Sequence, residues 1–303
     1  MQTIVPALLR RVNSIHYERE RIDTPDGDFL DIDWLKSDTK KIALLIHGLE
    51  ADTNMPYMKG MAKKLHSAGW CVAAMNLRGC SGEVNKKARA YHSGSTDDVE
   101  TAVNFILRYY PCEEMVLVGF SLGGNLTLKF LGEKGTSLPK EISKAVTISV
   151  PCDLTAGSTR LDSRLSFIYR DRFLKTLKLK LLQRQERLPF GLTVPEIKKI
   201  ASLFEFDSRY TAPMYGFRDA PDYYETCSAK KFIRNIKIPT LIITAKNDPF
   251  FTGDCLPFEE CDQHPNVFLE TPEEGGHVGF CTDLVAGNYY SEQRAIEFLQ
   301  RET

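Results

Sequence analysis

A five-residue stretch near the middle of the chain, Gly119-Phe120-Ser121-Leu122-Gly123, constrains the fold more than any other. The run 115–118 before it is entirely apolar, as expected of a strand buried on both faces, and the segment 126–131 after it is compatible with a helix. A serine between two glycines at a tight strand-to-helix turn holds its hydroxyl clear of the sheet, because glycine permits the close packing and strained backbone of such a turn. The stretch therefore predicts a nucleophilic serine, Ser121; the alternative is a turn of small residues without chemistry.

Apolar runs typical of strands recur along the chain and alternate with helical stretches. The predicted strands are 17–22, 29–35, 41–46, 70–75, 115–118, 145–150, 240–245 and 267–269, and the predicted helices include 57–68, 96–110 and 290–301. This alternation indicates an α/β fold with a mostly parallel sheet and helices on both faces. A turn at 25–28 joins the first two strands, which we expect to form an antiparallel edge.

A serine nucleophile needs a base to take its proton and an acid to orient that base. In folds with this kind of turn, the acid and then the base follow the serine along the chain. Of the two histidines after Ser121, His264 precedes the last predicted strand, which would place it at the wrong end of the sheet. His277 lies in a glycine-rich loop just beyond that strand and is the predicted base; a surface-loop histidine is the alternative.

Two aspartates compete for the role of the acid. Asp248 lies in the turn that follows the strand 240–244, and Asp153 follows the strand 145–150. The sequence favours Asp248. For either residue, an Asx turn or a helix cap is the structural alternative.

Acyl transfer also needs N–H donors for the oxyanion that forms in the transition state. One donor is normally the residue after the nucleophile, here Leu122. The stretch His47-Gly48-Leu49-Glu50 follows the strand 41–46 and supplies the second predicted donor, the N–H of Leu49. For His47 we favour a structural role, in which it fixes this loop.

The segment between residues 150 and 240 contains no clear core strand. We interpret residues 1–303 as one domain with a helical cap inserted at about 154–235. Within the cap, 164–187 is basic and amphipathic, which indicates a lid helix with a solvated basic face or, alternatively, a helix that rests weakly on an anionic lipid surface. Phenylalanines of the cap indicate a pocket for an acyl chain, namely Phe167, Phe173, Phe204 and Phe206.

Composition excludes several other classes of protein. A net charge of -1 without a basic arm argues against nucleic acid as a partner. The N-terminal apolar stretch is too short for a signal peptide, and the eight cysteines form no C-x-x-C pair or zinc-finger spacing. We expect a cytoplasmic protein with reduced thiols and without a metal or organic cofactor.

The chain resembles the AB-hydrolase 4 family of α/β-hydrolases, the YheT-like group. The segments that carry the resemblance, besides the stretch around Ser121, are His47-Gly48-Leu49-Glu50, Asn76-Leu77-Arg78-Gly79-Cys80-Ser81-Gly82, Tyr91-His92-Ser93-Gly94, Thr211-Ala212-Pro213-Met214-Tyr215-Gly216-Phe217, Asn247-Asp248-Pro249-Phe250 and Gly275-Gly276-His277-Val278-Gly279-Phe280. The resemblance implies the α/β-hydrolase fold with a mostly parallel central sheet, helices on both faces and a helical cap insertion. It implies a serine-dependent carboxylesterase that acts on short- to medium-chain acyl esters or lipids, with Ser121, Asp248 and His277 as its triad.

The expected mechanism runs through an acyl-enzyme on Ser121. Two alternatives use the same chain: transfer of the acyl group to an alcohol, and a catalytically silent scaffold that binds a small molecule or a protein. Arg78, in the family-typical loop 78–94, either holds that loop through backbone carbonyls or meets a substrate carboxylate or phosphate.

Overall fold

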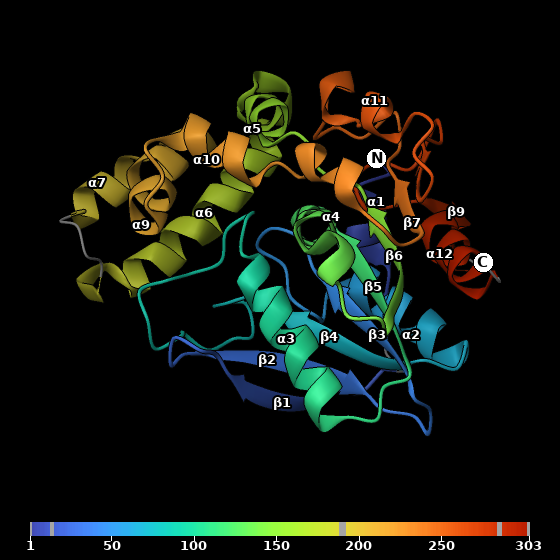
Figure 1. Ribbon diagram of the computed structural model, residues 1–303. Coiled ribbons are helices and arrows are strands. Elements are labelled where there is room, and N and C mark those ends of the chain that lie inside the picture. The colour runs from blue at the N-terminus through green and yellow to red at the C-terminus, as the bar shows by residue number, and fades with distance from the viewer. Residues whose placement is uncertain (1, 13–14, 188–191, 284–286, 302–303) are drawn as a thin grey trace.

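The computed structural model describes residues 2–12, 15–187, 192–283 and 287–301. Within these residues the centre of the molecule is an eight-stranded sheet in the order β1-β2-β4-β3-β5-β6-β7-β8 (Figure 1). Its strands are β1 (Glu18–Asp23), β2 (Phe29–Leu35), β3 (Lys41–Ile46), β4 (Cys71–Asn76), β5 (Glu114–Phe120), β6 (Ile142–Ile148), β7 (Thr240–Ile243) and β8 (Val267–Glu270). The strands from β4 to β8 in this order run parallel, and β1 and β2 form the predicted antiparallel edge.

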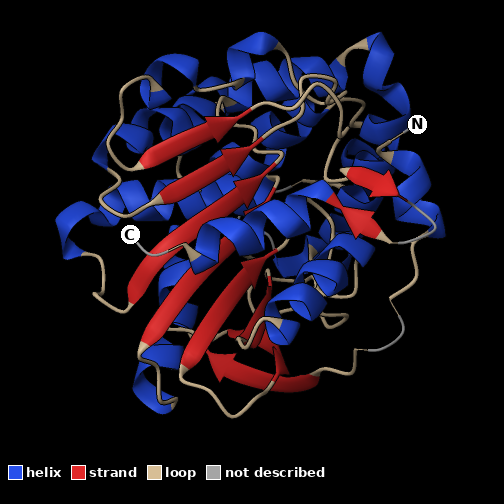
Figure 2. Cartoon of the chain, turned by 90° about the vertical axis from the view of Figure 1, so that its right-hand side faces the viewer, coloured by secondary structure: helices blue, strands red, loops and turns tan. Residues whose placement is uncertain are grey.

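Helices cover both faces of the sheet because its central strands are apolar on both sides (Figure 2). In β3, Ile42 and Leu44 join the core under α3 (Thr96–Tyr109) and α4 (Leu122–Lys134). The alternate residues Ala43 and Leu45 join the core under α2 (Pro56–Ser67) and α12 (Tyr290–Gln300). The predicted α/β architecture with a mostly parallel sheet is therefore confirmed.

The segment between β6 and β7 is helical and lies on one side of the molecule, above the sheet in Figure 1. Its elements are α5 (Leu154–Asp162), α6 (Phe167–Gln183), α7 (Val194–Lys199), α8 (Leu203–Phe206), α9 (Ala212–Tyr215) and α10 (Ala220–Cys227), with the short turns η2 (Arg164–Ser166), η3 (Gln185–Arg187) and η5 (Ala229–Asn235) and the π-helical turn η4 (Asp207–Thr211). These helices have an apolar core of their own, which includes Leu174, Ile197 and Phe206. Residues 188–191 of the predicted cap lie outside the described residues.

Some short elements were not expected from the sequence. They are α1 (Ile4–Leu9), α11 (Phe258–Cys261), the turns η1 (Gly135–Ser137) and η6 (Gly253–Cys255), and a small ladder of β9 (Cys281–Asp283) and β10 (Asn288–Tyr289). In addition, β6 begins at Ile142, three residues before the predicted start at 145. Polar residues at 143 and 144 hid this extension, because the side chain of Lys144 runs through a buried site to the carbonyl of Leu299 (Nζ–O 3.2 Å).

Candidate active site

Ser121 occupies the turn between β5 and α4, at the centre of the sheet. Its φ of 51° and ψ of -119° lie in a region that residues other than glycine rarely adopt. The turn closes because Gly123 has no side chain: a Cβ there would overlap the carbonyl oxygens of Ile46 and His47. Gly48 likewise lies directly against Ser121, since a Cβ on it would be 3.0 Å from the Cβ of Ser121.

The side chains of Ser121, His277 and Asp248 lie together beyond the ends of β5, β8 and β7. The Nε2 of His277 is 3.0 Å from the Oγ of Ser121, and its Nδ1 is 2.9 Å from Oδ2 and 3.2 Å from Oδ1 of Asp248. Both the imidazole and the carboxylate are almost fully buried. With the proton on Nδ1, the imidazole donates to Asp248 and offers Nε2 as an acceptor for the hydroxyl proton of Ser121.

Neighbouring residues hold the imidazole in this orientation. The ring of Phe250 stacks on it, with centroids 3.9 Å apart and planes at 23°. The backbone N–H of His277 donates to Oγ1 of Thr3 (2.9 Å), and the backbone N–H of Gly276 donates to Oδ1 of Asn247 (2.8 Å). Sequence reasoning missed these contacts. Asn247 could have been found beside Asp248 in its motif, but no sequence signal points to Thr3.

The rival residues are engaged elsewhere. Asp153 caps α5, since its Oδ1 accepts the N–H of Ala156 at 3.0 Å. The Nδ1 of His264 accepts the N–H groups of Asn266 and Val267 at the start of β8, the end of that strand opposite to His277. Asp153 therefore adopts the helix-cap alternative that the sequence left open, and His264 lies at the end of the sheet away from Ser121, as predicted.

In the loop after β3, the backbone N–H groups on either side of Leu49 both have acceptors. The N–H of Gly48 donates to the hydroxyl of Tyr57 (3.1 Å) and that of Glu50 to the hydroxyl of Tyr91 (2.8 Å). Within the described part of the chain, the N–H groups of Leu49 and Leu122 have no hydrogen-bond partner. Leu49 and Leu122 line the same cavity as Ser121.

His47 joins this loop to the residue that follows β4. Its Nε2 accepts the N–H of Leu77 at 3.1 Å, and its Nδ1 lies 2.8 Å from the carbonyl oxygen of Gly48. Burial lowers the pKa of His47 to about 4, so the ring is neutral at pH 7. A neutral ring that accepts a backbone N–H fits the structural role expected of His47.

A model of the α/β hydrolase fold family matches residues 44–284 of the chain. The chain belongs to the α/β-hydrolase family. It is 36% identical over 286 residues to an Escherichia coli (strain K12) protein named as an esterase, YheT, covering 92% of this chain and 83% of the other. It is 29% identical to the phospholipase ABHD3 of Homo sapiens, covering 92% of this chain and 70% of the other. These matches confirm the predicted resemblance to the AB-hydrolase 4 family.

Solved structures support the same fold. A Pyrococcus furiosus esterase, Pf2001, superposes with a TM-score of 0.64 over 95% of this chain and 91% of the other, at 19% identity. At that identity the likeness concerns the α/β-hydrolase fold alone.

Two cavities of this α/β-hydrolase meet at Ser121. The cap pocket, about 120 Å³, rises from Ser121 and Leu122 between cap residues that include Leu161, Leu177 and Phe206. The entrance pocket, about 290 Å³, is lined by Ser121, His277, residues of α1, and Tyr169 and Arg172 of α6. Of the four phenylalanines predicted to form an acyl pocket, Phe173 and Phe206 line the cap pocket. Phe167 and Phe204 do not: each is about half exposed, because it lies on the outer side of its helix.

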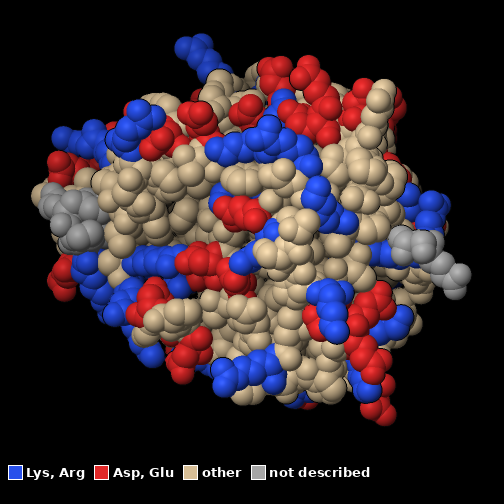
Figure 3. Space-filling view, in the orientation of Figure 1, with Lys and Arg blue, Asp and Glu red and all other residues tan. Residues whose placement is uncertain are grey.

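The predicted basic lid helix is α6, and its basic face is only partly solvated. Lys180 reaches Glu50 in the loop after β3 (Nζ–Oε1 3.0 Å), and Arg184, at the end of the helix, is buried. Exposed apolar side chains lie at the start of the helix, namely Leu165, Phe167 and Ile168. On the face shown in Figure 3, acidic and basic side chains are intermingled. Among the described helices, none is long and apolar enough to cross a membrane.

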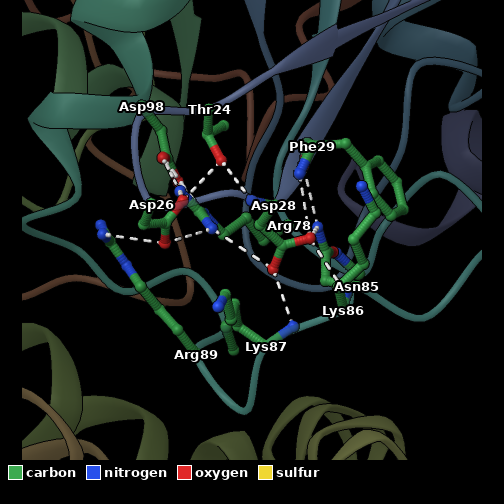
Figure 4. A network of polar contacts seen from close by, with 12 residues as sticks. Thr24, Asp26, Asp28, Phe29, Arg78, Asn85, Lys86, Lys87, Arg89 and Asp98 are labelled. Carbon is green, nitrogen blue, oxygen red and sulfur yellow. Dashed lines mark hydrogen bonds and ion pairs between the residues drawn. The ribbon is translucent and has the colours of Figure 1, made fainter.

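Arg78 holds its loop through carboxylates. The backbone carbonyls expected from the sequence are not its partners among the described residues. Its guanidinium is buried and lies 3.0 Å from Asp26, 3.4 Å from Asp28 and 2.7 Å from Asp98 (Figure 4). Burial alone would raise the pKa of Asp28, but hydrogen bonds from Asn85 and from backbone N–H groups outweigh it and lower the pKa. This saturated network leaves Arg78 no free face toward a substrate, which favours the structural interpretation.

Proposed function

We propose that this chain is a carboxylic ester hydrolase that acts through Ser121, His277 and Asp248. The observation that carries the proposal is the hydrogen-bonded chain from Ser121 through His277 to Asp248, at the junction of two cavities. The names of three relatives support the proposal: the esterase and the phospholipase named above, and a Saccharomyces cerevisiae monoacylglycerol lipase that is 28% identical.

In this mechanism the Oγ of Ser121 attacks the ester carbonyl while Nε2 of His277 takes its proton. Asp248 keeps the imidazole oriented and stabilises its charged form. The N–H groups of Leu49 and Leu122 bind the oxyanion of the tetrahedral intermediate. The intermediate collapses as His277 returns the proton to the leaving alcohol. Water, activated by His277, then hydrolyses the acyl-enzyme.

The two cavities support a proposal for the two halves of the substrate. The cap pocket is mostly apolar and is lined largely by cap residues, so it takes the acyl chain. The entrance pocket is larger and contains Arg172, so it takes the alcohol. We therefore propose short- to medium-chain acyl esters or lipids as substrates, and residues 154–235 as a cap on a single domain. The exposed apolar start of α6 supports weak contact with a membrane surface. The cytoplasmic location and the absence of a cofactor and of a nucleic-acid partner stay predictions from the sequence.

The test is hydrolysis of a series of p-nitrophenyl acyl esters by the wild type and by Ser121→Ala. We expect kcat to fall on the order of 10⁴-fold or more, because the nucleophile is lost. Ser137→Ala, an exposed serine outside both pockets, is the matched control and should keep wild-type activity. Full activity of the Ser121 variant would refute the proposal. Ester formation in added ethanol measures how far an alcohol competes with water for the acyl group.

A further inference from the structure

One wall of the cap pocket carries a carboxylate that the mechanism does not use. Asp207 begins the π-helical turn η4 and lines the pocket together with Thr211, Ser158 and Tyr224. These polar side chains come from η4, α5 and α10, and α5 and α10 lie next to each other in the cap (Figure 1). The rest of the wall around them is apolar and includes Leu154 and Leu203.

Hydrogen bonds fix the position of this carboxylate. Tyr224 donates to Oδ2 at 2.7 Å and Thr211 donates to Oδ1 at 2.6 Å. The hydroxyls of Ser158 and Tyr224 are 2.9 Å apart. A carboxylate has about four acceptor sites, so Asp207 keeps about two for a further donor.

No cation in the described part of the chain compensates Asp207. None of its lysines or arginines lies within 4.0 Å of the carboxylate. Burial raises the pKa of Asp207 to about 6, and the neighbouring Asp162 adds to the effect. A partly buried carboxylate without a neighbouring cation destabilises the fold, and perturbed titratable groups in a cleft cluster at functional sites. Single π-helical turns are also frequent at functional sites.

We propose that Asp207, Thr211, Tyr224 and Ser158 form a polar subsite for a hydrogen-bond donor, a hydroxyl or an amino group, carried on the acyl chain of the ester. The inference rests on the proposed function, because the chain reaches the subsite from Ser121 through the cap pocket. The apolar wall binds the methylene groups, and the subsite selects chains whose polar group lies at the matching depth. It thereby distinguishes functionalised acyl chains from plain ones.

The alternative is that Asp207 only joins η4 to α10. A joining role would lower the activity on every ester by the same factor. A subsite changes the ratio between two esters that differ at a single group, so this ratio is the quantity to measure.

The experiment compares kcat/KM for pairs of ethyl esters in which a terminal hydroxyl or amino group replaces a methyl group. The pairs are 4-hydroxybutanoate with pentanoate, 6-hydroxyhexanoate with heptanoate and 8-hydroxyoctanoate with nonanoate, and the amino acid esters of the same lengths. At one length we expect the wild type to prefer the donor-bearing chain by about tenfold or more, the size of a hydrogen bond to a charged group. A greater preference for the amine indicates an ammonium ligand, and a greater preference for the alcohol a neutral one.

Asp207→Asn, which keeps the shape but not the charge, should reduce this preference at least threefold. Glu225→Gln is the matched control. That carboxylate is exposed on α10 and does not line the cap pocket, so the ratio should not change. If Asp207→Asn does not fold, Asp207→Glu serves in its place: it keeps the charge but moves the carboxylate by one methylene group, so the preference should move to another chain length.

The inference is overturned if the wild type shows no preference at any length, or if the Asp207 variant retains the preference. Failure of the proposed function looks different: the wild type would then hydrolyse none of the esters, and a fluorophosphonate probe would leave Ser121 unlabelled.

Discussion

The carboxyl end of the sheet and the cap position their side chains in different ways. At the carboxyl end of the sheet, Ser121, Asp248 and His277 each follow a strand, so the register of a buried parallel sheet determines their spacing. In the cap, Asp207 comes from a π-helical turn and Leu177 from α6, and their positions depend on how the cap helices pack. Parallel strands are held by evenly spaced hydrogen bonds, whereas the crossing angles of packed helices vary by about 15–20°. We infer that residues at the carboxyl end of the sheet perform the chemistry and that the cap determines which substrates bind.

The largest expected effect concerns Asp248, the proposed acid of the triad at the carboxyl end of the sheet. Asp248→Asn should lower kcat by about 10³- to 10⁴-fold on every ester, because the amide favours the wrong tautomer of His277. Asp153→Asn, which removes only the charge of a helix cap, should change kcat by no more than a few-fold. Steady-state kinetics on one plain ester measures both. A large loss in the Asp153 variant together with an active Asp248 variant would reverse the assignment.

The two regions also differ in how their stability depends on pH. His47, at the carboxyl end of β3, has a pKa of about 4, against about 6.5 in an unfolded chain. Between these values the unfolded chain binds a proton that the folded chain does not, so stability falls as the pH drops. The loss should be about 2 kcal/mol between pH 7 and pH 5. Asp207 in the cap acts in the opposite sense, because its raised pKa makes stability fall as the pH rises toward 6.

Urea unfolding at pH 7 and pH 5 measures the contribution of the histidine. In His47→Gln, whose amide can still accept the N–H of Leu77, the pH dependence should shrink by that amount. His16→Gln, an exposed histidine, is the control and should behave as the wild type. An unchanged pH dependence in the His47 variant would contradict the prediction.

The smallest expected effect concerns the cap. Leu177→Ala enlarges the cap pocket and should move the preferred acyl chain to a greater length, with changes of a few-fold in kcat/KM. Leu165→Ala, on the exposed surface of the cap, should leave the length profile unchanged. The profile is read from the p-nitrophenyl ester series. An equal loss on all chain lengths would mean that the cap also takes part in the chemistry.

The same contrast explains which parts of the molecule could be predicted from the sequence. The strands β2 and β3 have their predicted bounds, because a run of apolar residues is sufficient to identify a buried strand. The prediction that His277 would meet Ser121 depended only on chain order and strand ends. That Phe173 would line a pocket while Phe167 would not depends on the rotation of α6, which periodicity does not fix. The three carboxylates around Arg78 come from two separate segments, and only the folded chain brings them together.

The hydrogen bond from His277 to Thr3 has a consequence for the order of assembly. It joins residues that are 274 positions apart, and closing so long a loop is entropically costly until the sheet between them exists. The histidine loop should therefore reach its final position late in folding and be among the first parts to loosen. An intact Ser121–His277 contact would then report that both ends of the chain have docked.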